Sequence, residues 1–100
     1  MADLNVATTI VMQLGGFKFM SMTGARDFVG GPDSVMFRIP SARRINKVRV
    51  TLTPMDTYRV EFFRIARRGC NFQLVSSADD VYADSLQDVF SHHTGLDTHL

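Results

Sequence analysis

The sequence predicts an α+β fold: a single antiparallel sheet of four to five strands, arranged as a meander, with an N-terminal and a C-terminal helix packed on one face. Two observations lead to this class. Apolar and polar residues alternate through the middle of the chain, whereas apolar residues recur at spacings of three and four near both ends. Short turns separate the alternating segments, which favours antiparallel neighbours. With 100 residues, we expect one domain over 1–100, with a helix over 1–15, the sheet over 17–75 and a helix over 78–94.

The first helix is expected over residues 1–15. Ala7, Val11 and Leu14 recur at helical spacing, and Gly15 with Gly16 supplies a stop. Several β-branched residues in this segment would also suit a strand. Residues 17–23, which follow the two glycines, are expected to form the first strand of the sheet.

Three further strands are indicated by the alternation. The positions expected to face the core are Val35, Phe37, Ile39, Val48, Val50, Leu52, Tyr58, Val60 and Phe62. Turn-forming residues at 30–33 and 54–57 separate these strands from their neighbours. Pro40 is expected to end the strand that contains Phe37, and residues 70–74 form a fifth candidate strand.

The second helix is expected over residues 78–94. Its apolar stripe would consist of Tyr82, Leu86, Val89, Phe90 and His93. Asp79 and Asp80 would fall in the first turn, where the helix dipole favours carboxylates, and Gly95 would end the helix.

Charge is unevenly distributed along a chain whose formal net charge is only +1. Nine basic residues and two acidic residues lie between positions 38 and 68, whereas positions 79–100 hold five acidic residues and no Lys or Arg. One interpretation is that a basic sheet packs beside an acidic helix and the two neutralise each other. The other is that the basic segment binds an anionic partner.

The candidate binding residues come from this basic segment. If the apolar positions face the core, the opposite face of the sheet carries Arg38, Lys47, Arg49, Arg59 and Phe63, while the adjoining turns carry Arg43, Arg44, Arg67 and Arg68. Arginines interleaved with an aromatic ring are typical of surfaces that bind single-stranded nucleic acid. Alternatively, the cations belong to a solvated face, with Phe63 in a second small cluster or an oligomer contact.

Two other clusters have competing interpretations. Asp80, Asp84 and Asp88 would form a helical stripe that either imitates phosphates or is simply a solvated face. A second cluster, at the C-terminal end, could offer zinc ligands, but the end of a chain rarely preorganises a metal site, so we expect no bound metal. The residues of that cluster are His92, His93, His99 and Asp97.

Catalysis is not indicated by any motif. The sequence contains no nucleophile elbow, phosphate-binding loop or HExxH, and its single cysteine cannot form a CxxC pair. We therefore expect a protein that is not an enzyme and needs no cofactor. The absence of a long apolar run or a basic N-terminal region predicts a cytoplasmic protein that does not contact a membrane.

A set of short segments carries a resemblance to a known family. These segments are 22–25 (MTGA), 27–29 (DFV), 37–40 (FRIP), 45–48 (INKV), 55–58 (MDTY), 60–62 (VEF), 81–86 (VYADSL) and 94–96 (TGL). Together they resemble a family of small, mostly uncharacterised accessory proteins encoded by bacteriophages and other mobile elements. The resemblance implies an accessory role in the cytoplasm of an infected or lysogenic bacterial host, and it supplies no catalytic residues.

Three function classes follow from these observations. The leading one is a non-enzymatic accessory protein that binds a host nucleoprotein complex or its nucleic acid, as an anti-defence inhibitor of the anti-CRISPR type would. A second is a single-stranded nucleic-acid-binding module that uses the basic face. The third is a structural protein that associates with itself, as a homodimer.

Overall fold

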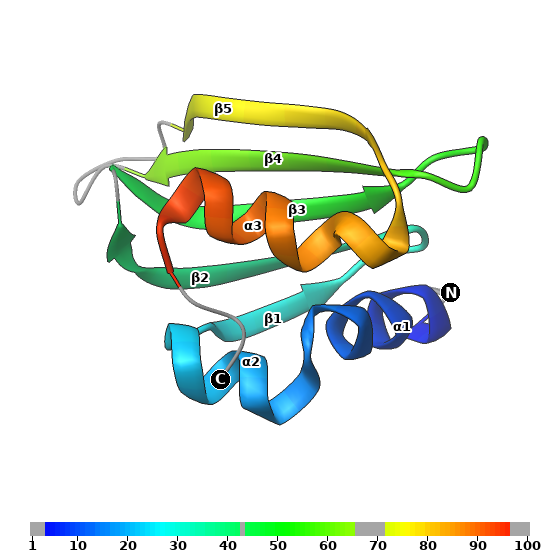
Figure 1. Ribbon diagram of the computed structural model, residues 1–100, viewed down its shortest axis with the longest axis horizontal. Helices are drawn as coiled ribbons and strands as arrows, with labels where there is room; N and C mark the ends of the chain where they lie inside the picture. The colour runs from blue at the N-terminus through cyan, green and yellow to red at the C-terminus, as the bar shows by residue number, and fades with distance from the viewer. Residues whose placement is uncertain (1–3, 43, 66–71, 97–100) are drawn as a thin grey trace.

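The computed structural model describes residues 4–42, 44–65 and 72–96, and it has the expected α+β architecture (Figure 1). The strands are β1 (Arg26–Gly30), β2 (Ser34–Ala42), β3 (Ile45–Leu52), β4 (Tyr58–Ile65) and β5 (Phe72–Val81). The helices are α1 (Leu4–Leu14), α2 (Gly16–Thr23) and α3 (Leu86–Thr94), the last preceded by a short 3₁₀ turn, η1 (Ala83–Ser85). Each strand pairs antiparallel with its neighbour in the chain, so the predicted meander is confirmed with five strands.

The core lies between one face of the sheet and the three helices, which Figure 1 shows on the same side of the strands. Phe19 of α2 sits in the middle of it: its ring centroid is 5.6 Å from that of Phe37 and 5.0 Å from that of Phe90. The alternation of apolar and polar residues correctly identified the core-facing positions of β2, β3 and β4. All but Leu52 of the expected core-facing residues are buried, and Leu52 packs against the core at its border.

The opposite side of the sheet, which we call the outer face, is covered by none of the described helices (Figure 1). Its residues are the alternate positions of each strand. Register therefore decides which of them become neighbours, and three rows across the strands result. The first joins Arg26, Arg38, Lys47, Phe63 and Leu74; the second Val29, Met36, Arg49, Glu61 and Ser77; the third Ser34, Thr51 and Arg59.

The prediction of a strand over 17–23 is wrong, because these residues form α2. Gly15 and Gly16 both have positive φ, and this turns the chain between α1 and α2. Phe19 is then fully buried, and the Thr23 hydroxyl donates a 2.7 Å hydrogen bond to the Phe19 carbonyl oxygen. The helix ends at Gly24 with φ 73°, a left-handed cap. The buried contact of Phe19 outweighs the local preference of this segment for a strand.

The boundaries at the C-terminal end also differ from the prediction. The expected strand over 70–74 continues to Val81, and the expected helix over 78–94 begins only at Leu86. Val81 pairs with Tyr58 and is buried, so pairing with β4 outweighs the helical signal of the two aspartates. Tyr82 is 64% exposed instead of lying on the apolar stripe.

The acidic helical stripe is therefore not formed. Asp80 lies in β5, Asp84 in η1 and Asp88 in α3. The expectation that Pro40 ends its strand is wrong as well, since β2 continues to Ala42. A register shift between Arg38 and Ala42 accommodates the proline, which has no backbone N–H to donate.

Candidate functional site

Three cations lie side by side on the outer face. Arg26 of β1 pairs with Arg38 of β2, which pairs in turn with Lys47 of β3. Paired residues on adjacent strands are about 5 Å apart, so this basic row spans about 10 Å. Arg38 and Lys47 were predicted site residues, whereas Arg26 was missed. Only the pairing of β1 with β2, which the sequence does not show, brings Arg26 into the row.

Asp27 contacts both arginines of the basic row. Its Oδ2 is 3.9 Å from Arg38 Nη1 and 4.0 Å from Arg26 Nε. All three side chains are at least half exposed, and exposed ion pairs at such distances contribute little. Arg26 and Arg38 are therefore two exposed cations whose charge is only weakly balanced by Asp27.

Arg49 and Arg59, which were also predicted site residues, are held in cross-strand ion pairs. Arg49 places Nη2 at 2.8 Å and Nε at 2.9 Å from Oε1 of Glu61. Arg59 Nε lies 2.7 Å from Oδ1 of Asp79, and this hydrogen bond raises the pKa of the Arg59 guanidinium. Both arginines thus connect neighbouring strands and have their charge balanced locally.

Phe63 lies on the outer face but is almost completely covered, at 7% exposure. The guanidinium carbon of Arg49 sits 5.3 Å from the centre of its ring, within the range of a cation–π interaction. A base could stack on this ring only after Arg49 had moved. The structure therefore supports the alternative in which Phe63 belongs to a second small cluster.

Two further arginines line a hollow where the β2–β3 turn meets the end of β4 and the beginning of β5. This hollow, which we call the basic corner, has a volume of about 190 Å³ and is lined by Arg44, Arg64, Gln73, Leu74 and Val75. Within residues 4–42, 44–65 and 72–96, neither arginine forms an ion pair with a carboxylate. Arg44 was predicted. Arg64 was missed, although its place in the basic segment was a signal for it.

The basic row and the basic corner lie toward the same end of the strands, at the left in Figure 1. The opposite end carries exposed carboxylates: Asp33, Asp56, Asp80 and Asp84. The charge segregation along the chain thus becomes a polarity along the strand axis. Arg43, Arg67 and Arg68, the other predicted site residues, lie outside the described residues.

His92 and His93 occupy the last turn of α3. His93 is half-buried, and burial lowers its pKa, as does the neighbouring His92. His99 and Asp97 of the suggested zinc cluster lie outside the described residues, and those that are described include no group of three His, Cys, Asp or Glu side chains arranged to hold a metal ion.

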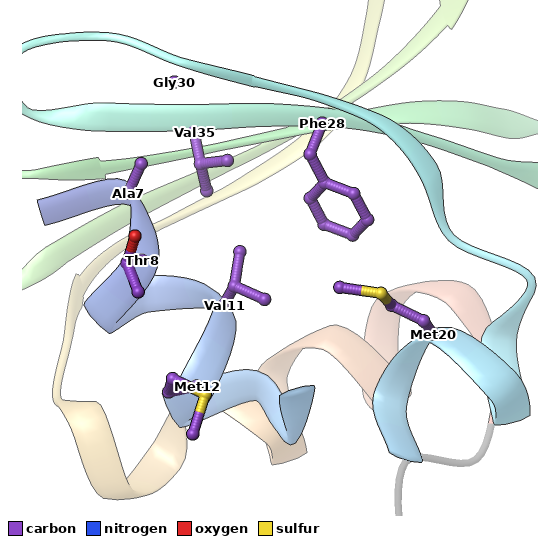
Figure 2. Close-up of a pocket in the computed structure, with 8 residues that line it drawn as sticks. All are labelled: Ala7, Thr8, Val11, Met12, Met20, Phe28, Gly30 and Val35. Carbon is purple, nitrogen blue, oxygen red and sulfur yellow. The ribbon is translucent and has the colours of Figure 1, made fainter. Parts of the chain in front are cut away.

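An apolar hollow of about 300 Å³ lies between α1, α2 and β1. Figure 2 shows Val11 of α1 and Met20 of α2 extending toward the strands, where Phe28 projects into the same space. Met12, which is 66% exposed, also lines the hollow. Thr8 supplies the only side-chain hydroxyl of the lining. This hollow could receive an apolar group, but it has no groups suited to catalysis.

Comparisons of the chain with protein-family models, with curated proteins and with solved structures find no match. In the described part of the chain, no helix combines the length and the apolar character needed to cross a membrane.

Proposed function

We propose that this chain is a non-enzymatic accessory protein of a phage or mobile element that binds the nucleic acid of a host nucleoprotein complex in the bacterial cytoplasm. The observation that carries the proposal is the register of Arg26, Arg38 and Lys47 on a sheet face that no described helix covers. Arg44 and Arg64 extend the positive surface around the same end of the sheet.

The chemistry of this surface suits phosphodiester groups. Guanidinium groups form two parallel hydrogen bonds with phosphate oxygens, and cations that neutralise phosphates release condensed counterions. Such binding needs no reacting group. An inhibitor of a CRISPR-type defence complex would act by occupying a nucleic-acid site, and the resemblance to phage accessory proteins supports that setting.

The basic end of the sheet is a better candidate than the whole face. Use of Arg49 or Arg59 for phosphates would require breaking the ion pairs with Glu61 and Asp79. A single-stranded nucleic-acid-binding module that stacks bases on Phe63 would also have to uncover that ring. Both requirements cost free energy. Phosphates that approach Arg26 and Arg38 would displace exposed contacts with Asp27 at 3.9–4.0 Å, which contribute little.

Fluorescence anisotropy with labelled single-stranded and duplex oligonucleotides tests the proposal at about 50 and 200 mM salt. If all five cations meet phosphates, the log–log salt slope should be about −3.5 for single strands and about −4.5 for duplexes. Arg38→Glu should weaken binding by at least about tenfold and reduce that slope. Lys18→Glu is the matched control, because Lys18 is an exposed cation on α2, on the side of the sheet that the helices cover.

Two results would overturn the proposal: no binding at micromolar protein, or binding that Arg38→Glu and Lys18→Glu weaken equally. A protein partner with an apolar anchor in the hollow beside Met20 would then become the better explanation. Capture from host lysate, with and without a Val11→Asp substitution in the hollow, would test that explanation.

A further inference from the structure

We propose that the basic corner binds a terminal phosphate, that is, a phosphate monoester at the end of the bound nucleic acid strand. This assignment rests on the proposed function and adds which part of the strand Arg44 and Arg64 meet. The corner is a hollow of about 190 Å³ lined by these two arginines and Gln73, beside two apolar residues. Guanidinium and amide groups donate hydrogen bonds to phosphate oxygens, and none of the described lining residues is acidic.

The backbone of Arg44 gives the first reason to assign a ligand to this residue. Ala42 pairs with Ile45, so the turn between β2 and β3 has only two residues, and Arg44 is the second of them, with φ 68°. Such turns need a left-handed backbone, which Gly and Asn adopt at a lower cost than arginine does. At every other described position with a positive φ, the residue is Gly or Asp. Strain of this kind is concentrated at binding sites, where the side chain has a role besides forming the turn.

The sheet holds the two arginines on a fixed framework. The side-chain amide of Asn46 donates a 3.0 Å hydrogen bond to the Ile65 carbonyl oxygen, and it accepts one of 2.8 Å from the Ile65 N–H. Asn46 lies two residues after Arg44, and Ile65 directly follows Arg64. This pair of hydrogen bonds therefore joins the two backbone segments that carry the arginines. Gln73 is the β5 partner of Arg64, so a third donor stands beside them.

The position of the corner favours the end of a nucleic acid strand over its middle. Leu74, which lines the corner, lies in the same cross-strand row as Arg38 and Lys47. β5 is the last strand of the sheet (Figure 1), so a nucleic acid strand that follows the basic row leaves the sheet at the corner. Leu74 and Val75, which are 53% and 41% exposed, offer apolar contact to the last sugar or base.

A terminal phosphate suits the corner better than a phosphodiester does. A monoester carries a charge of about −1.5 to −2 at pH 7 and has three free oxygens, whereas each phosphodiester carries a single negative charge. Three oxygens can accept hydrogen bonds from two guanidinium groups and an amide at the same time. Within the described residues neither arginine of the corner is paired with a carboxylate, so binding breaks no ion pair there.

Fluorescence anisotropy with single-stranded oligonucleotides of about eight nucleotides, labelled at an internal base, tests the assignment. The three probes share one sequence and end in a 5′-phosphate, in a 3′-phosphate or in hydroxyl groups only. One phosphorylated probe should bind at least about tenfold more tightly than the hydroxyl probe, because the corner then makes charge-assisted hydrogen bonds with a dianion. The probe that is preferred gives the direction of the bound strand.

Two substitutions in the corner should remove this preference. Arg44→Asn and Arg64→Gln should each reduce it to below about threefold. Because asparagine suits a left-handed backbone, Arg44→Asn should melt at least as high as the wild type, which separates the lost preference from a loss of folding. Arg38→Glu is the matched control. It should weaken the binding of every probe by a similar factor and keep the preference, since Arg38 meets phosphates within the strand.

Equal affinities for the three probes overturn the assignment, and so does a preference that Arg38→Glu removes as fully as Arg44→Asn does. In both cases, salt-sensitive binding of the hydroxyl probe leaves the proposed function standing. Absence of binding by all three probes at micromolar protein overturns the proposed function and the terminal-phosphate site together.

Discussion

The His93 ring lies flat on the Phe62 ring, with the centroids 4.5 Å apart and the planes inclined by 12°. Nδ1 of the same imidazole is 2.9 Å from the Ser76 hydroxyl oxygen. One side chain at the end of α3 thus joins the helix to β4 and β5. It contacts the sheet from the core side, behind the edge strand that carries the exposed Leu74 and Val75.

This contact predicts a loss of stability in mild acid. Burial, and secondarily the neighbouring His92, lower the pKa of His93 below its ordinary value of 6.5. The unfolded chain therefore takes up the proton at a higher pH than the folded chain does. The free energy of unfolding should decline as the pH falls below 6.5, and the loss should be complete below the folded-state pKa. Thermal melting between about pH 7.5 and pH 5.5 measures this decline.

His93→Gln removes the titration while retaining a polar group for Ser76, so it should flatten the profile in this window. His92→Gln should leave most of the decline, because burial is the larger cause of the lowered pKa of His93. A wild-type melting temperature that stays constant over this range would contradict the prediction.

Truncation of the core should show that α3 packs on the sheet as described. Phe90 is 1% exposed and its ring lies 5.0 Å from that of Phe19, so Phe90→Ala leaves a cavity. The expected cost is about 3–5 kcal/mol in the free energy of unfolding, measured by urea denaturation. Tyr82→Ala is the informative control, since Tyr82 was expected on the same apolar stripe but is mostly exposed. Its cost should stay below about 0.5 kcal/mol.

The alternation of apolar and polar residues in β2, β3 and β4 could be recognised in the sequence because each of these strands buries one face only. A period of two then distinguishes the buried positions from the others. The two segments that were predicted wrongly, α2 and the end of β5, depend on contacts with residues far away in the sequence. Phe19 selects a helix by packing between Phe37 and Phe90, and Val81 selects a strand by pairing with Tyr58. Local propensity cannot report on either contact.

The candidate site was only partly predictable for a related reason. The sequence indicates which cations face outward, but the register determines which of them meet a carboxylate. Arg49 and Arg59 lie opposite or beside acidic residues of the next strand, whereas Arg38 lies between Arg26 and Lys47 and meets Asp27 in an exposed contact of 3.9 Å. Charge balance on a sheet is a property of neighbouring strands, and a single sequence does not show it.

The cap of α2 should be sensitive to a single added methyl group. Gly24 has φ 73°, and a Cβ at this position would lie 2.8 Å from Cγ of the Pro40 ring. Gly24→Ala should therefore cost about 2–3 kcal/mol, combining left-handed backbone strain with a clash against a rigid ring. Gly16→Ala separates the two effects, because its φ is 60° but its Cβ would meet only Met12 Sδ at 3.6 Å. Urea denaturation measures both variants. If Gly24→Ala and Gly16→Ala lower the free energy of unfolding equally, the contact with Pro40 adds nothing to the cost.

The ion pair between Arg49 and Glu61 should contribute to stability instead of nucleic-acid binding. Glu61 is only 16% exposed and accepts two contacts from Arg49, which is 40% exposed. Arg49→Met and Glu61→Gln should each lower the free energy of unfolding by about 1–2 kcal/mol. The double variant should lose about 0.5–1 kcal/mol less than the sum of the two, which a double-mutant cycle measures.

Oligonucleotide binding by Arg49→Met should stay within about twofold of wild type, because the phosphates meet the basic row instead. Additive losses together with a large drop in binding would instead make Arg49 a phosphate contact, and the binding surface would then extend beyond the basic end.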